Sequence, residues 1–263
     1  MKRRISTGNH FLFIRTCLQS GLACLLPLLV HNAFAKDFKA SIAHIPMLAE
    51  SAEEGPFIDL TKALDDAYEE GSFTIKVYPM GRSLNNVVDG RADFHLPMIH
   101  SPYVDLNSLP YRFASQTMGS VCFVIYSHKE NPITAQMIVD NTGADIFPYK
   151  IETLRGMKGL LQLPFAIEEA SQIEQSLRNI AKKRIDALIF AQEETDFVLR
   201  QLSLSSIHRS LFACWDDVIV IPKGDKGDAI DKVIATALQA LNDNGTLVQL
   251  RKKIHVPYID WQP

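Results

Sequence analysis

The side chains best suited to binding chemistry fall in three short polar segments. His100 and Ser101 offer hydrogen-bond donors and acceptors where an apolar run ends. Thr153 could cap a helix that begins directly after it, which would place backbone N–H groups and Arg155 where an anionic group binds. Glu193 could receive a cationic group. Together these side chains predict a site for a small polar or charged molecule.

Apolar side chains near these segments would complete such a site, and several of the polar ones also have purely structural explanations. Met47 and Met98 are expected to form apolar walls. Thr153 could cap a helix with no ligand present. Glu193 and Glu194 stand where a helix should begin, and the helix dipole favours carboxylates there. Both interpretations remain open at this point.

Catalytic and metal-binding patterns are weak in this sequence. It has no nucleophile elbow, no HExxH and no clustered histidine or cysteine spacing. His95 and His100 are expected to be ordinary core or loop histidines. A general acid–base pair of Glu193 and His100 is conceivable. The sequence therefore predicts no metal and no cofactor, and it favours a binding protein over an enzyme.

Hydrophobic periodicity predicts strands that alternate with helices. Strands are predicted near residues 39–45, 73–78, 92–98, 121–126, 149–153, 185–190 and 218–221. Helices are predicted near residues 56–70, 84–89, 134–139, 154–161, 173–182, 193–201, 229–242 and 246–254. This alternation favours βαβ units and a mostly parallel sheet. One β/α plan occurs twice, each time followed by an apolar strand, which predicts a chain that leaves one lobe, builds a second and returns.

The N-terminal 35 residues are interpreted as a cleaved signal peptide. Lys2, Arg3 and Arg4 precede a short apolar core at residues 22–30, and residues 33–35 (AFA) supply the small residues that a signal peptidase reads. The core is shorter than the about 20 apolar residues that a membrane span needs. Cys24 raises a lipoprotein alternative, but Gly21 stands where a lipobox has leucine. A periplasmic protein that begins at Lys36 is expected.

Composition limits the classes of partner. Hydrophobic residues make up 47% of the chain, enough to fill a core, and the formal net charge is -3. No basic run follows the signal segment, so binding to nucleic acid is not expected. Of the four cysteines, Cys122 and Cys214 would remain after cleavage. Two cysteines cannot build a disulfide scaffold but could form a single bridge.

A series of short motifs runs in order through the chain. Residues 55–60 (GPFIDL) open the first predicted helix, residues 89–93 (DGRAD) lead into the next strand, and residues 183–187 (KRIDA) repeat that turn in the second half. Residues 222–224 (PKG), 237–241 (ALQAL) and 244–245 (NG) follow the returning strand. In this order the motifs resemble the periplasmic solute-binding proteins of ABC importers, the family 3 type that mostly binds amino acids.

The resemblance implies an α/β, two-lobed periplasmic-binding-protein fold of type II. Each lobe would be a mostly parallel sheet flanked by helices, and two strands would form the hinge. Residues 36–118 and 217–263 would form lobe 1, and residues 119–216 would form lobe 2. Cys122 and Cys214 would then lie near each other on the two crossover strands, where a disulfide between them could form.

The resemblance also implies a function. The protein would capture a small polar metabolite between its lobes, as a monomer, and would deliver it to an ABC permease in the inner membrane. The crevice should lie beyond the carboxyl ends of the strands, along residues 44–50, 97–101, 153–155 and 191–194. The alternative is a periplasmic enzyme on the same fold, a lyase resembling cyclohexadienyl dehydratase. A sensory lobe is a third class, but such lobes usually continue into a membrane segment, which the sequence lacks after residue 35.

Two positions depart from the family's amino-acid clamp. The family usually carries an arginine for the ligand carboxylate after its third strand, but residues 97–103 (PMIHSPY) contain none. Ala191 stands where the family has an acidic residue for the α-amine. Arg112, the next arginine along the chain, is expected to pair with a surface carboxylate. The motifs therefore predict the fold without predicting an amino acid as the ligand.

Overall fold

A computed structural model describes residues 36–263 of the protein. The predicted signal peptide and its cleavage site lie outside the described residues. None of the helices between residues 36 and 263 has the length and hydrophobicity of a membrane span.

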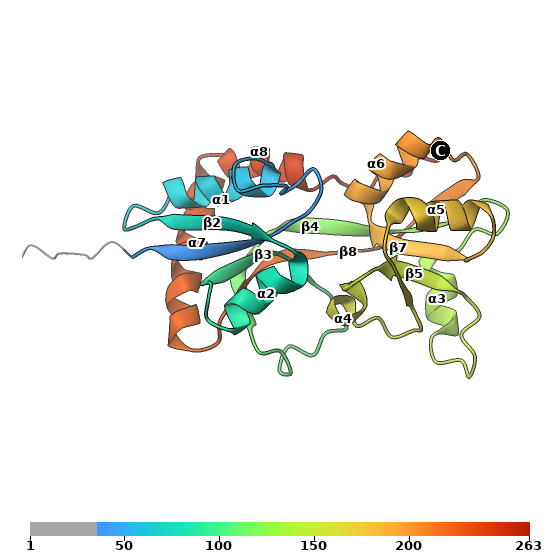
Figure 1. Ribbon diagram of the computed structural model, residues 1–263, viewed down its shortest axis with the longest axis horizontal. Helices are drawn as coiled ribbons and strands as arrows, with labels where there is room; N and C mark the ends of the chain where they lie inside the picture. The colour runs from blue at the N-terminus through green and yellow to red at the C-terminus, as the bar shows by residue number, and fades with distance from the viewer. Residues whose placement is uncertain (1–35) are drawn as a thin grey trace, which may run out of the picture. The chain divides into compact units, whose positions relative to one another are not determined.

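The described chain alternates strands and helices (Figure 1). The strands are β1 (Phe38–Ala43), β2 (Phe73–Tyr78), β3 (Phe94–His100), β4 (Arg112–His128), β5 (Ile151–Leu154), β6 (Glu168–Ala170), β7 (Ala187–Ala191) and β8 (Ile207–Ile221). The helices are α1 (Pro56–Asp66), α2 (Met80–Val88), α3 (Ala135–Asn141), α4 (Met157–Leu161), α5 (Ile173–Ala181), α6 (Gln192–Leu202), α7 (Asp225–Asp243) and α8 (Thr246–Ile254).

The strands form one sheet with the order β2-β1-β3-β8-β4-β7-β5-β6. β1, β2 and β3 are parallel at one end, and β5, β6 and β7 are parallel at the other. The two long strands β8 and β4 lie between these sets and run antiparallel to each other. The fold is therefore that of a two-lobed α/β protein with two crossover strands, as the sequence predicted.

Each lobe has its own hydrophobic core. In lobe 1, helices α1, α7 and α8 pack on one face of the sheet around Phe57, Ile219 and Leu238. Helix α2 closes the opposite face around Val87 and Met98. In lobe 2, helices α3 to α6 pack around Phe123 and Leu177 (Figure 1). The lobe boundaries at residues 118/119 and 216/217 stay a prediction, since both fall inside strands that continue from one core to the other.

Several predicted elements differ in detail from the structure. Helix α1 ends at Asp66 rather than near residue 70, and α2 begins at Met80 rather than near residue 84. Pro97 was expected to break the apolar run at residues 92–98, but the strand continues through it to His100. The register between β3 and β8 shifts between His95 and Met98 and so accommodates a residue that cannot donate a ladder hydrogen bond. The short strand β6 was not predicted, since its sequence EEA has no apolar alternation.

The crossover strands are joined covalently at the passage between the lobes. Cys122 on β4 lies opposite Cys214 on β8, with their Cα atoms 4.0 Å apart, and a disulfide links them.

Arg112 at the start of β4 pairs with Asp228 and Asp231 of α7, so its predicted pairing with carboxylates is confirmed.

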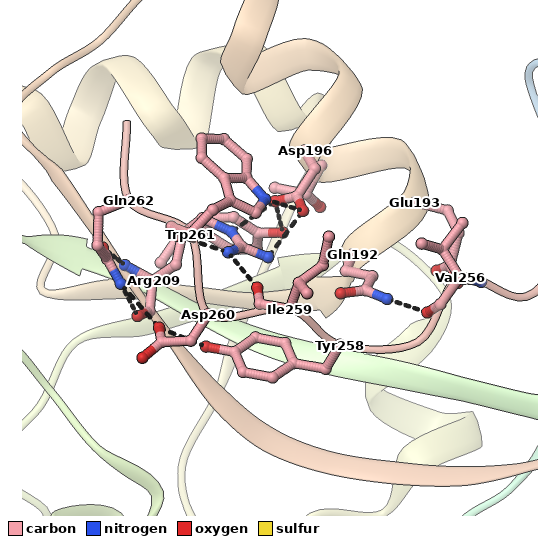
Figure 2. Close-up of polar contacts among 12 residues, drawn as sticks. Gln192, Glu193, Asp196, Arg209, Val256, Tyr258, Ile259, Asp260, Trp261 and Gln262 are labelled. Atoms are coloured by element: carbon pink, nitrogen blue, oxygen red, sulfur yellow. Dashed lines mark hydrogen bonds and ion pairs between the residues drawn. The ribbon is translucent and has the colours of Figure 1, made fainter.

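The segment after α8 crosses from lobe 1 to lobe 2, and the C-terminus lies beside α6 (Figure 1). Its anchor is Arg209 on β8, whose guanidinium is fully buried and forms two 2.7 Å hydrogen bonds to Asp196 of α6 (Figure 2). The same guanidinium donates to the carbonyl groups of Ile259 and Trp261 and lies 4.5 Å from the Trp261 ring centroid. One buried cation therefore fixes the last residues of the chain to lobe 2.

The buried Arg209–Asp196 pair yields a stability prediction. Arg209→Leu should lower the free energy of unfolding by about 3 kcal/mol or more, because Asp196 would stay buried without its cation. Arg178→Leu is the matched control, since the Arg178–Glu174 pair is largely exposed and should contribute about 0.5 kcal/mol or less. Urea denaturation of both variants measures the difference, and equal losses would contradict the assigned role of Arg209.

Candidate functional site

A cavity of about 480 Å³ lies between the lobes and is lined by both of them. Its walls are mainly apolar and aromatic side chains. Lobe 1 contributes Phe57, Met80, Leu84 and Met98. The crossover strand β4 and lobe 2 contribute Val121, Phe123, Met157, Leu160 and Phe190. The volume and lining are typical of a small-molecule site.

The lobes touch at one side of this cavity. Ser101, directly after β3 of lobe 1, is fully buried, and its hydroxyl donates a 2.7 Å hydrogen bond to the carbonyl of Leu161 at the end of α4. Leu160 of the same helix packs against the lobe 1 cluster around Met98 and Val218. The described conformation is therefore one in which the lobes are in contact.

Five charged or titratable side chains line the cavity. They are His44, Arg155, Glu193, Glu194 and Asp217. Three of the five are carboxylic acids, and Arg155 is the one lysine or arginine among the described lining residues. The polar part of the cavity is thus predominantly acidic.

Glu193 and Glu194 stand in the first turn of α6, directly after the buried strand β7. Burial in the apolar cavity raises the pKa of Glu193 to about 7. Burial, and then the neighbouring charge of Glu193, raise the pKa of Glu194 to about 8. Backbone N–H groups at the helix start oppose both rises, so loss of hydration is the stronger effect. Both carboxyl groups therefore titrate near neutral pH.

The segment after α8 holds the start of α6 in place. Gln192 donates a hydrogen bond to the carbonyl of Val256, and the Val256 N–H donates to Glu193 Oε1 at 3.2 Å (Figure 2). The carboxylate of Glu193 is therefore positioned by a segment that comes from lobe 1.

Asp217 on β8 is the most deeply buried carboxylate of the cavity. It has no exposed surface, and its Oδ2 lies 2.9 Å from Nε2 of His255. Burial raises the pKa of Asp217, while His255 and the backbone N–H groups of Met98 and Val218 oppose that rise. Within the described part of the chain, Asp217 Oδ1 and His255 Nδ1 have no hydrogen-bond partner. Gly119 allows this packing, since a Cβ there would lie 2.4 Å from His255 Nδ1.

Arg155 lies at the rim of the cavity rather than inside it. The residue is exposed, and its guanidinium donates a 3.1 Å hydrogen bond to the hydroxyl of Ser171. Arg155 follows β5, and Gly156 with φ of 90° separates it from α4.

Three of the seven predicted ligand residues line the cavity, namely Met98, Arg155 and Glu193. Met47 lines a shallower depression beside Pro56 and Phe197 instead. His100 does not line the cavity, and its ring lies 5.0 Å from the ring of Phe113. The general acid–base pair of Glu193 and His100 that the sequence suggested is therefore not brought together in the cavity. His95 is a core histidine, as predicted, and bonds to Ser83 at 2.7 Å.

Ser101 and Thr153 make other contacts than the sequence suggested. The hydroxyl of Ser101 donates its hydrogen bond across the contact between the lobes. Thr153 lies inside β5 and caps no helix, because the strand continues to Leu154 and α4 begins at Met157. Thr153 is fully buried with Oγ1 unpartnered among the described residues. The expectation that Thr153 caps a helix is therefore wrong.

Sequence reasoning missed Asp217 and His255 as parts of the site. It placed Glu194 in a segment along the crevice but did not single it out as a ligand residue, because carboxylates are common at helix starts. Asp217 stands in the segment WDDVIV. An acidic residue within an apolar strand is a sequence pattern that could have indicated a buried functional carboxylate. Among residues 36–263, no group of three or more histidine, cysteine or acidic side chains is arranged to hold a metal ion.

No protein-family model matches the sequence. No curated protein matches it either. Among solved structures, the GluR0 ligand-binding core from Nostoc punctiforme in complex with L-glutamate matches with a TM-score of 0.62 and 17% identity, over 82% of this chain and 98% of that one.

Two further structures match comparably. The probable amino-acid ABC transporter extracellular-binding protein from Bacillus subtilis has a TM-score of 0.58 and 19% identity, over 85% of this chain and 100% of that one. An ancestral amino acid-binding protein, a precursor of cyclohexadienyl dehydratase, has a TM-score of 0.58 and 15% identity, over 82% and 94%. The resemblance seen in the motifs is thus confirmed at the level of the fold.

The raised pKa values predict how stability depends on pH. The folded protein binds more protons than the unfolded chain between the ordinary glutamate pKa of 4.5 and the folded values of about 7 and about 8. Its free energy of unfolding should therefore fall as pH rises through that window. Glu194→Gln should flatten the fall and raise stability near pH 9 by about 1 kcal/mol or more.

Urea denaturation near pH 5 and near pH 9 measures this effect. Glu174→Gln is the control, because Glu174 also stands in the first turn of a helix but is exposed. A pH dependence that is unchanged in Glu194→Gln would show that Glu194 titrates normally.

Proposed function

We propose that this protein is an extracytoplasmic solute-binding protein that captures one small molecule in the cavity between its lobes. The observation that carries the proposal is the cavity itself, which is lined from both lobes and closed at one side by their contact. The solved structures of the same fold include an ABC transporter binding protein and a glutamate-bound core. Delivery to an ABC permease, export by a cleaved signal peptide, a periplasmic location and a monomeric state belong to the same proposal.

The two-lobed construction supports capture by closure. A ligand that contacts both lobes binds the closed state more tightly than the open one, and this difference in affinity shifts the equilibrium towards closure. Strands β4 and β8 are the connections that would bend, and they already show register shifts near Phe113, Thr117 and Gly119. The contact between Ser101 and Leu161 would form on closing.

An enzyme on the same fold is the second candidate. Glu193 supports it, since a carboxyl group with a pKa of about 7 can act as a general acid or base near neutral pH. One solved structure of this fold is an ancestral precursor of cyclohexadienyl dehydratase. Turnover of a ligand by the purified protein would distinguish this candidate from a binding protein.

Native mass spectrometry of freshly purified protein, followed by a thermal-shift screen of small metabolites, tests the binding proposal. We expect one molecule bound per chain and a raised melting temperature. The variant Met80→Trp should weaken that binding at least tenfold, because Met80 lines the cavity and a larger ring there would occupy ligand volume.

Met137→Trp is the matched control, since Met137 is exposed on α3 and does not line the cavity. Unchanged affinity in Met80→Trp, with both variants folded, would place the ligand elsewhere. Absence of any bound or stabilising molecule would contradict the proposed function.

A further inference from the structure

We infer that the ligand is an apolar monocation, namely a protonated amine with a hydrocarbon body and no carboxylate. Its ammonium group would lie among Glu193, Glu194 and Asp217, and its hydrocarbon part against the aromatic walls. This inference rests on the proposed function and names the chemical class of the molecule that the cavity takes.

The charge of the lining is the first observation. Three carboxylic acids face the cavity, whereas the one lysine or arginine among the described lining residues, Arg155, is exposed at the rim and bonded to Ser171. His44 also lines the cavity, and His255 lies behind Asp217. A bound cation would favour the ionised form of these carboxyl groups, whereas a bound anion would disfavour it.

The unpartnered oxygen of Asp217 is the second, independent observation. Asp217 lines the cavity with no exposed surface, and its Oδ2 is bonded to His255 while its Oδ1 has no hydrogen-bond partner among residues 36–263. The backbone N–H groups of Met98 and Val218 favour the ionised carboxylate, but no hydrogen bond reaches Oδ1, and a buried carboxylate oxygen without a donor is unfavourable. An ammonium group carries three donors and no acceptor, which is the complement of such an oxygen.

Few groups of the described cavity suit a ligand carboxylate. The positive end of α6 points at its own Glu193 and Glu194. Helix α4 has five residues and no side-chain cap, and Thr153 lies in β5 instead of capping it. For a ligand carboxylate, the lysine or arginine that the described lining offers is Arg155, which is exposed and uses one of its five N–H donors on Ser171.

The remainder of the cavity fits a hydrocarbon body. Phe57, Phe123 and Phe190 present rings, and Met80, Met98 and Leu160 fill the space between them. Aromatic faces also favour a nearby cation. A phenyl ring or a branched aliphatic chain joined to one amine suits this lining.

Four probes that share a phenethyl body but differ in charge test the inference by isothermal titration. Phenethylamine is the cation, phenylalanine the zwitterion, hydrocinnamate the anion and phenethyl alcohol the neutral compound. We expect phenethylamine to bind at least tenfold more tightly than each of the other three. Tighter binding of the zwitterion or the anion, or binding by none of the four, would overturn the inference.

Two variants test whether the preference for the amine depends on Glu193 and Glu194. Glu194→Gln and Glu193→Gln should each weaken phenethylamine at least tenfold and leave phenethyl alcohol within about twofold, whereas Glu174→Gln on the exposed start of α5 should change neither. Equal weakening of the amine and the alcohol would indicate lost packing instead of lost charge recognition and would overturn the inference.

Proton release gives a separate readout. An ammonium bound beside Glu193 and Glu194 would lower their raised pKa values, so binding should release protons near neutral pH and tighten as pH rises towards about 8. Titrations in buffers of different ionisation enthalpy measure that release, and its absence would count against the amine. A co-purified anion or zwitterion would overturn this inference while supporting the proposed function, so the two fail separately.

Discussion

Two antiparallel strands, β4 and β8, determine where everything else in the protein lies. Their pairing runs from Arg112 to His128 on one strand and from Ile207 to Ile221 on the other, so both strands contribute to the cores of both lobes. β3 pairs with the lobe 1 end of β8, and β7 pairs with the lobe 2 end of β4. The Cys122–Cys214 bridge prevents the two strands from separating at the passage between lobes. Because the cavity opens beside this passage, Val121, Phe123 and Asp217 all reach it from the crossover strands.

Burying the acidic side chains of the cavity costs energy that the contacts within the fold do not fully offset. Glu193, Glu194 and Asp217 all have raised pKa values, and burial is the largest cause in each case. A carboxylate retained for structure is normally paired, as Asp196 is with Arg209. Groups held near an apolar cavity with weak compensation are instead typical of functional sites.

The fold was more predictable from the sequence than the site, for a physical reason. Strand β2 was predicted at Phe73–Tyr78 as the structure has it, because strand and helix periods depend on a few adjacent residues. The ordered motifs predicted the two lobes. The site is formed by residues that are far apart in the sequence, such as Met80, Phe123 and Asp217. No local sequence pattern predicts that these side chains line one cavity. Thr153 shows the error most clearly, since a three-residue change in where a helix begins removed its expected role as a cap.

The C-terminal segment adds a third connection between the lobes and bears directly on how they can move. Helix α8 belongs to the core of lobe 1, but Trp261 and Gln262 are held on lobe 2 by Arg209. Between these anchors, His255 contacts Asp217 on a crossover strand, and Val256 contacts Gln192 and Glu193 (Figure 2). Any separation of the lobes therefore has to be absorbed in this segment as well as in β4 and β8. Since the same segment positions the Glu193 carboxylate, a change in lobe separation and a change in the acidic end of the cavity are mechanically coupled.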